Sequence, residues 1–179
     1  MKLYPEISKS VIKKSFDYFR DKNIEFSINL SIIDIKNNFT ISFLEDEFKK
    51  DKNFLNKITL EILESESIDD IEIFNDFINR VKKYGIKIAI DDFGSGYSTF
   101  SNLLKIKPDI IKIDSSIIKD IDKDKDRQAL VKAIVATSKM LNSITIAEYV
   151  STKSIFETLV DLEVDQFQGY YIGKPSDKV

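Results

Sequence analysis

The chain contains no cysteine and no histidine in its 179 residues. Without cysteine, disulfides, thiolate nucleophiles and cysteine-ligated zinc are excluded. Without histidine, a Ser-His-Asp triad and an HExxH zinc site are excluded as well. Any acid–base chemistry must therefore use carboxylates, lysines, tyrosines or metal-bound water.

The sequence also lacks a surplus of basic residues and a long apolar run. Its formal net charge is −3, so no basic surface favours a nucleic acid, and we expect no DNA partner. No apolar stretch approaches the ~20 residues that span a bilayer. The start of the chain, residues 1–14, lacks the apolar core of a signal peptide. We therefore expect a cytoplasmic protein without a membrane segment.

What the sequence does have is an alternation of short apolar runs with helix-length segments, which specifies a parallel sheet. No linker-like or low-complexity tract marks a second domain, so residues 1–179 are predicted to form a single α/β domain. Gly85 is expected to close one of the helices. The expected strands are 25–30, 57–62, 86–91, 109–113, 143–147 and 165–170, and the main expected helices are 8–21, 39–53, 69–84, 126–141 and 152–162.

Six strands are fewer than the eight of a closed TIM-type (β/α) barrel, which typically has ~250 residues. We therefore predict an incomplete TIM-type barrel of about six parallel strands, with the missing pair before residue 1 or with an open sheet. The edge strands 25–30 and 165–170 would then be paired with another chain, covered, or poorly soluble.

Polar side chains follow each of the six apolar runs. Because a parallel barrel presents the C-terminal ends of its strands in one mouth, we predict that these side chains lie at one common rim. Adjacent carboxylates suit two divalent cations ~3.5–4 Å apart, although an Asp-Asp-Phe-Gly segment alone is equally compatible with a turn and a helix cap. The residues are Asn29, Glu61, Asp91 with Asp92, Lys112 with Asp114, Glu148 and Gln168.

Lys112 requires a partner, because a lysine inside an apolar strand is costly to bury alone. Asp114 is two residues further on and faces the same side of the strand. A structural Lys–Asp pair and a lysine that meets a carboxylate and a phosphate in the mouth are both open. Glu61 is a better ligand candidate than Glu64, which could instead cap the next helix.

Asn29 offers either a neutral oxygen ligand or a turn amide. Gln168 either contacts a nucleobase or backbone, or simply ends a strand.

Together these segments resemble the EAL domain, the bacterial cyclic di-GMP phosphodiesterase family. Residues 88–114, IAIDDFGSGYSTFSNLLKIKPDIIKID, are similar to the family's DDFG loop and the KID strand that follows it. The segments INLS, LEILE, IAEYV and DQFQGYYIGKP resemble further family segments in the same order. The resemblance covers about residues 5–175.

The resemblance implies a TIM-type barrel, a pair of Mg²⁺ or Mn²⁺ ions, and hydrolysis of one phosphodiester of cyclic di-GMP to linear pGpG. It also implies a homodimer through the 92–105 loop and helix, and an upstream regulatory domain outside this chain. The site residues that it implies are Asn29, Glu61, Asp91 and Glu148 as metal ligands, Asp92 at the second metal, Lys112, Glu148 and Asp92 as catalytic residues, and Asp114 and Gln168 in the substrate pocket.

The sequence departs from the family pattern in three respects. The Glu-Ala-Leu strand and the strand before it are absent, so we expect an N-terminally truncated domain. Tyr149 stands where the family has a glycine, and Ser151 stands where it has a second glutamate. We therefore expect turnover by this chain alone to be weak or absent. The alternative is a non-catalytic module that binds cyclic di-GMP or a protein.

Overall fold

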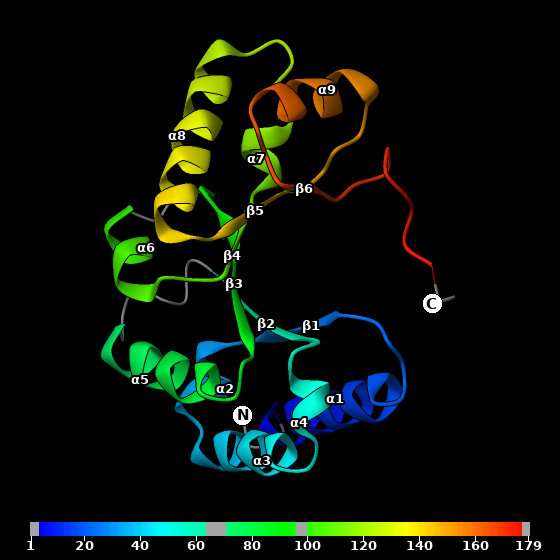
Figure 1. The fold of residues 1–179 in the computed structure, drawn as a ribbon, viewed down its shortest axis with the longest axis vertical. Coiled ribbons are helices and arrows are strands. Elements are labelled where there is room, and N and C mark those ends of the chain that lie inside the picture. The colour runs from blue at the N-terminus through cyan, green and yellow to red at the C-terminus, as the bar shows by residue number, and fades with distance from the viewer. Residues whose placement is uncertain (1–3, 64–70, 96–99, 177–179) are drawn as a thin grey trace. The chain divides into compact units, whose positions relative to one another are not determined.

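Helices and strands alternate along the chain in a computed structural model that describes residues 4–63, 71–95 and 100–176 (Figure 1). The elements are α1 (Tyr4–Phe19), β1 (Phe26–Leu30), α2 (Ile32–Lys36), α3 (Asn38–Phe48), α4 (Lys52–Leu55), β2 (Ile58–Leu63), α5 (Ile71–Lys82), β3 (Lys87–Phe93), α6 (Phe100–Ile106), β4 (Ile110–Ile113), α7 (Ser115–Ile118), α8 (Lys125–Leu141), β5 (Ile144–Ala147), α9 (Lys153–Asp161) and β6 (Gln166–Phe167).

The strands form one six-stranded sheet in the order β1-β2-β3-β4-β5-β6. The pairings β1 with β2, β4 with β5, and β5 with β6 are parallel, as the alternation predicts. Among the described strands, β1 and β6 are the two ends of this order. The prediction of about six parallel strands in an incomplete TIM-type barrel is confirmed.

Three strands end differently from their predicted ends. β2 ends at Leu63 instead of residue 62. β3 continues to Phe93 instead of stopping at Asp91. β6 contains only Gln166 and Phe167 rather than the whole of 165–170. Gln168 therefore lies beyond its strand.

The chain divides into two compact units, residues 1–89 and residues 90–179. In the first unit, α1 buries Ile12 and Phe16. The ring of Phe16 packs against Phe26 and Phe54, with ring centroids 6.2 Å and 5.7 Å away. The apolar residues 11, 12, 16 and 19 predict one buried helical face, but Val11 is 54% exposed. The buried stripe of α1 is therefore narrower than its sequence pattern indicates.

The expected helix 39–53 is divided in the structure, because α3 ends at Phe48 and α4 begins at Lys52. Leu44 and Phe48 of α3 are buried, and so are Phe74 and Phe77 of α5. Gly85, at φ +80°, donates its N–H to the Lys82 carbonyl and ends α5 as predicted. Glu64, the alternative to Glu61, lies outside the described residues.

In the second unit, α8 begins at the charged segment that the sequence marks as a solvated helix start. Asp124 caps it by accepting hydrogen bonds from the backbone N–H groups of Asp126 and Arg127 at 3.0 Å and 3.1 Å. The sequence pattern of this helix predicts that Leu130, Ile134, Val135 and Leu141 face the core. Ile134 and Val135 are buried as predicted, whereas Leu130 is 41% exposed and the neighbouring Val131 is buried.

Candidate active site

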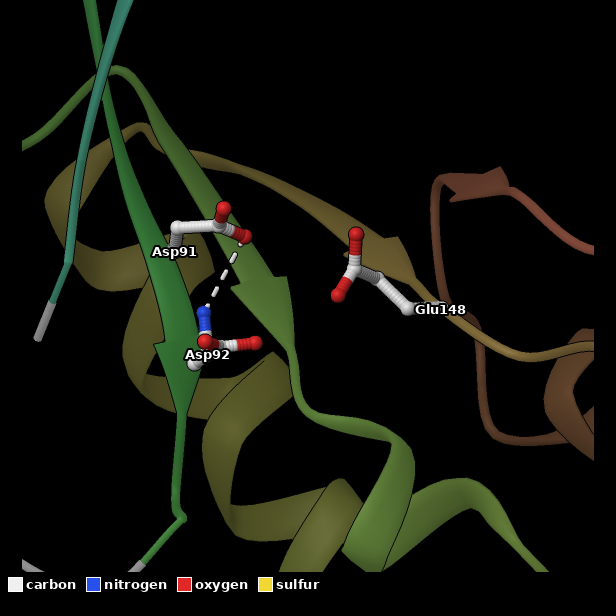
Figure 2. A group of neighbouring side chains, drawn as sticks. All are labelled: Asp91, Asp92 and Glu148. Atoms are coloured by element: carbon white, nitrogen blue, oxygen red, sulfur yellow. Dashed lines mark hydrogen bonds between the residues drawn. The ribbon is translucent and has the colours of Figure 1, made fainter. Parts of the chain in front are cut away.

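Asp91 and Asp92 are adjacent residues whose side chains reach the same space. In a regular strand they would face opposite sides of the sheet. Asp92 instead has a φ of +55°, which breaks the alternation inside β3. Its backbone N–H donates to Asp91 Oδ1 at 3.1 Å and holds the turned conformation (Figure 2). Phe93 and Gly94 then turn the chain: Gly94 has a φ of +93°, and the Ser95 N–H donates to the Asp92 carbonyl at 3.2 Å.

The carboxylates of Asp91, Asp92 and Glu148 form an acidic cluster in the second unit. One oxygen from each lies within 4.8 Å of the others, and all three residues are half-buried. Glu148 directly follows β5, and its backbone N–H donates to the Ile113 carbonyl of β4 at 3.2 Å. Figure 2 shows the carboxylates turned toward one another. The predicted convergence of these three residues is therefore found in the structure.

Lys112 is the positive partner of the acidic cluster. It comes from β4, where Ile146 of β5 is its register partner, and its side chain is only 8% exposed. Its Nζ lies 2.7 Å from Asp91 Oδ1 and 3.0 Å from Glu148 Oε1. Lys112 therefore meets carboxylates from two neighbouring strands, and its contact with a phosphate stays a prediction. A buried cation between two carboxylates fixes the positions of all three groups.

The acidic cluster holds more negative charge than its surroundings stabilise. Burial raises the pKa of Glu148, and the Asp91 and Asp92 carboxylates add to this, although Lys112 opposes them. Burial also raises the pKa of Asp92, helped by repulsion from Asp91 and Asp114. Such upward shifts mean that the fold disfavours the ionised forms. Clustered carboxylates of this kind are typical of sites that use a cation.

Asp114 caps α7 rather than forming the predicted structural pair with Lys112. Its Oδ1 accepts the backbone N–H of Ser116 at 2.9 Å, and its Oδ2 accepts the Ser115 hydroxyl at 3.3 Å. Burial on its own raises the pKa of Asp114, but these hydrogen bonds outweigh it and hold the pKa below its usual range. Its place in the substrate pocket stays a prediction.

Gln168 follows β6, and its backbone is hydrogen-bonded to the end of β5 and to the segment after it. Its backbone N–H donates to the Ala147 carbonyl at 2.8 Å, and its own carbonyl accepts the Val150 N–H at 3.0 Å. A Cβ on Gly169 would lie 2.3 Å from the Val150 nitrogen, so only glycine allows this close approach. The Gln168 side chain is thereby placed near the chain that leaves Glu148.

Tyr149 and Tyr170 are two residues of this region that the sequence analysis did not assign to the site. With Ser151, Gln168 and Gly169 they line a pocket of about 330 Å³, which we call the aromatic hollow. Tyr149 was noted only as a departure from the family glycine. The pairing of segment 148–151 with segment 168–171, which creates the hollow, has no local sequence signal.

Gly169→Ala is expected to destabilise the second unit by about 2–4 kcal/mol, from backbone strain at φ +153° together with the clash against Val150. The measurement is urea denaturation. Gly173→Ala is the matched control, since a Cβ there meets nothing within 4 Å. Equal urea midpoints for Gly169→Ala and Gly173→Ala would contradict the close approach of Gly169 to the Val150 backbone.

Asn29 and Glu61 belong to the first unit, where they are register partners in β1 and β2. Paired residues of neighbouring parallel strands point to the same face, so their side chains are neighbours. Asn29 is exposed and Glu61 is half-buried. Glu61 lies within β2, two residues before the strand ends at Leu63. Their membership of one rim with the acidic cluster stays a prediction.

The donor set of the acidic cluster fits a hard divalent cation. Its groups are carboxylate oxygens, the ligands that Mg²⁺ and Mn²⁺ prefer. A cation there would also relieve the repulsion that raises the pKa values of Asp92 and Glu148. The fold and the site together define an α/β domain of barrel type with a buried lysine and an acidic cluster that could hold a metal ion.

The chain belongs to the EAL domain family, whose model matches residues 1–175. Among its curated relatives is the cyclic di-GMP phosphodiesterase PdeA of Borreliella burgdorferi, which is 36% identical over 176 residues. The match covers 95% of this chain and 26% of that protein. The chain thus spans about a quarter of the length of this relative.

Solved structures with the same fold include a manganese and cyclic di-GMP complex of Klebsiella pneumoniae BlrP1. Its TM-score is 0.85 at 25% identity, and the match covers 95% of this chain and 44% of that one. An EAL domain protein from Listeria monocytogenes has a TM-score of 0.77 at 28% identity, with 97% and 67% of the two chains covered. The predicted family and fold are therefore confirmed.

Within residues 4–63, 71–95 and 100–176, none of the helices combines the length and the apolar character that crossing a membrane requires.

Proposed function

We propose that this chain is a metal-dependent phosphodiesterase domain that hydrolyses one phosphodiester of cyclic di-GMP to give linear pGpG. The observation that carries the proposal is the acidic cluster with Lys112 Nζ at 2.7 Å and 3.0 Å from two of its carboxylates. Membership of the EAL domain family and the name of the Borreliella burgdorferi relative support the substrate.

Lys112 is proposed to act on the scissile phosphate and on the attacking water. Its Nζ carries three donors on a buried side chain, and the pairing with Asp91 and Glu148 leaves it fixed in position. A fixed ammonium group stabilises the negative charge that develops on the phosphate oxygens. One water is consumed as its oxygen bonds to phosphorus, and the bond from phosphorus to the ribose 3′ oxygen breaks.

Asp91, Asp92 and Glu148 are proposed to hold the cations, with Asn29 and Glu61 as further ligands. Two divalent cations, Mg²⁺ or Mn²⁺, would supply charge neutralisation of the phosphate and activation of the water. The half-burial of the three carboxylates limits competition from solvent. Asp114 and Gln168 are proposed to complete the substrate pocket.

Turnover is proposed to be slow compared with that of a relative that has a glutamate at both of the positions held here by Glu148 and Ser151. Ser151 stands at the second position and is exposed. Its hydroxyl brings no negative charge to the site. The homodimer through 92–105, whose residues 96–99 lie outside the described part of the chain, the upstream regulatory domain and the cytoplasmic location stay predictions.

Purified chain, incubated with Mn²⁺ and cyclic di-GMP, is expected to release pGpG, resolved by chromatography. Glu148→Gln is expected to lower the rate by at least ~100-fold, because it removes a carboxylate ligand and a partner of Lys112. Glu157→Gln makes the same change at an exposed position of α9 and is expected to leave the rate unchanged.

Binding of cyclic di-GMP without release of pGpG, at enzyme concentrations that detect one turnover per day, would contradict the proposal. That result would favour the alternative of a non-catalytic binding module.

A further inference from the structure

The aromatic hollow and the acidic cluster are linked by two consecutive residues of the chain. Glu148, a member of the cluster, is followed immediately by Tyr149, which lines the hollow. The opposite segment, with Gln168 and Tyr170, is fixed to it by backbone hydrogen bonds at 2.8–3.0 Å. A ligand whose phosphate meets Lys112 and the cluster therefore has this hollow within reach of its neighbouring groups.

Tyr149 keeps an unfavourable backbone conformation and an exposed ring. Its φ is +59°, in the left-handed region that bulky residues rarely adopt. Its side chain is 53% exposed, so core packing does not account for a tyrosine at this position. Tyr170 is 70% exposed. Backbone strain of this kind clusters at active sites and ligand-binding sites.

The residues that line the hollow suit an uncharged planar group with hydrogen-bond donors and acceptors along its edge. None of its five lining residues is charged, so the hollow itself is not a phosphate site. The Gln168 carboxamide offers both a donor and an acceptor, which a purine edge can satisfy. The volume of about 330 Å³ is at the small end for ligand pockets and suits one base rather than a whole dinucleotide.

We propose that Tyr149, supported by Tyr170, is a stacking platform for one purine base of the substrate, with Gln168 at the edge of that base. This proposal rests on the proposed function, because it takes the ligand to be a purine dinucleotide whose phosphate lies at Lys112. It adds a binding residue that the family pattern, with glycine at this position, does not contain. Sequence-tolerant stacking on an aromatic ring strengthens the binding of a base about 5- to 150-fold.

The test compares Tyr149→Gly with Tyr149→Phe. Glycine removes the ring and suits the left-handed backbone, so the variant is expected to fold, which circular dichroism checks. Phenylalanine keeps the ring. The KM for cyclic di-GMP is expected to rise about 5- to 150-fold in Tyr149→Gly and by less than about 2-fold in Tyr149→Phe. Hydrolysis of bis(p-nitrophenyl) phosphate, a diester without a purine edge for Gln168, is expected to fall less in Tyr149→Gly than hydrolysis of cyclic di-GMP does.

A second measurement tests base stacking on Tyr149 independently of phosphodiesterase activity. Saturation-transfer NMR with GMP is expected to show saturation of the purine H8 proton by the wild-type chain and Tyr149→Phe, and its loss in Tyr149→Gly. A wild-type chain that hydrolyses neither diester would overturn the proposed function, and the GMP result would still decide the platform. An unchanged KM and unchanged GMP saturation in Tyr149→Gly, or no GMP saturation by the wild-type chain, would overturn the platform.

Discussion

Lys112→Met is expected to remove turnover and to destabilise the metal-free protein at the same time. Methionine keeps much of the length of the side chain but not its charge. The Asp91 and Glu148 carboxylates, now 2.7 Å and 3.0 Å from Nζ, would be left without this cation in a largely buried site. Breaking a buried pair of this kind costs about 3–5 kcal/mol. Loss of a fixed donor to the transition state lowers the rate about 10²- to 10³-fold.

The destabilisation has a defined dependence on pH. Lys112 counteracts the burial that raises the pKa of Glu148, so its removal raises that pKa further. A carboxyl whose pKa is higher in the folded state than in the unfolded state destabilises the fold only where it is ionised. The deficit of Lys112→Met therefore appears as the pH rises above about 4.3, the usual pKa of glutamate, and reaches its full size above the folded pKa.

The measurement is urea unfolding with EDTA at pH 4.5 and at pH 7.5. Lys132→Met, at an exposed position of α8, is the control and is expected to show no such change between the two pH values. Mn²⁺ is expected to reduce the deficit, because a bound cation replaces the lost positive charge. Equal stability of Lys112→Met and the wild-type chain at pH 7.5 in EDTA would show that Lys112 is not the counter-charge of the cluster.

The parts of the fold and site that could be predicted share a simple physical basis. Buried parallel strands are apolar on both faces, so runs such as 58–63 and 110–113 are visible in the sequence. Their C-terminal ends meet at one edge, so the approach of Asp91 and Glu148 follows from strand order. The burial of Lys112 follows from its place within an apolar strand.

The parts that could not be predicted depend on local conformation or on chain-to-chain contact. The short helices α2, α4 and α7 have 5, 4 and 4 residues, too few for a hydrophobic period. Leu130 and Val131 are adjacent apolar residues, and only packing decides which is buried. The left-handed turn at Asp92 is equally invisible, because aspartate occupies that region in loops without any functional site.

Asp92→Asn is expected to stabilise the metal-free protein and to weaken its response to metal. Burial and the neighbouring Asp91 raise the pKa of Asp92, so its ionised form destabilises the fold. Asparagine carries no charge and tolerates a φ of +55°. Gains of about 1 kcal/mol are usual when a charge kept for function is removed, which corresponds to ~2–4 °C in Tm for a chain of this size.

The upward shift of the Asp92 pKa also determines the pH range in which Asp92→Asn stabilises the protein. Below about 3.9, the usual pKa of aspartate, Asp92 is protonated in both states, and the charge contributes no difference between Asp92→Asn and the wild-type chain. The advantage of the variant grows as the pH rises from there and is complete above the raised pKa of the folded state. Asp120→Asn is the matched control, because Asp120 has a φ of +59° but is exposed and outside the acidic cluster.

Adding Mn²⁺ is expected to reverse the order of the two proteins. A cation that binds only the folded state adds about 2.7 kcal/mol at 100 times its Kd. The wild-type chain, with all three carboxylates, receives this stabilisation, whereas Asp92→Asn lacks one ligand and receives little of it. Thermal unfolding with EDTA and with Mn²⁺ gives both differences. Asp92→Asn could instead gain stability in EDTA and still respond to Mn²⁺ as the wild-type chain does. That result would show that Asp92 is not a ligand of the metal.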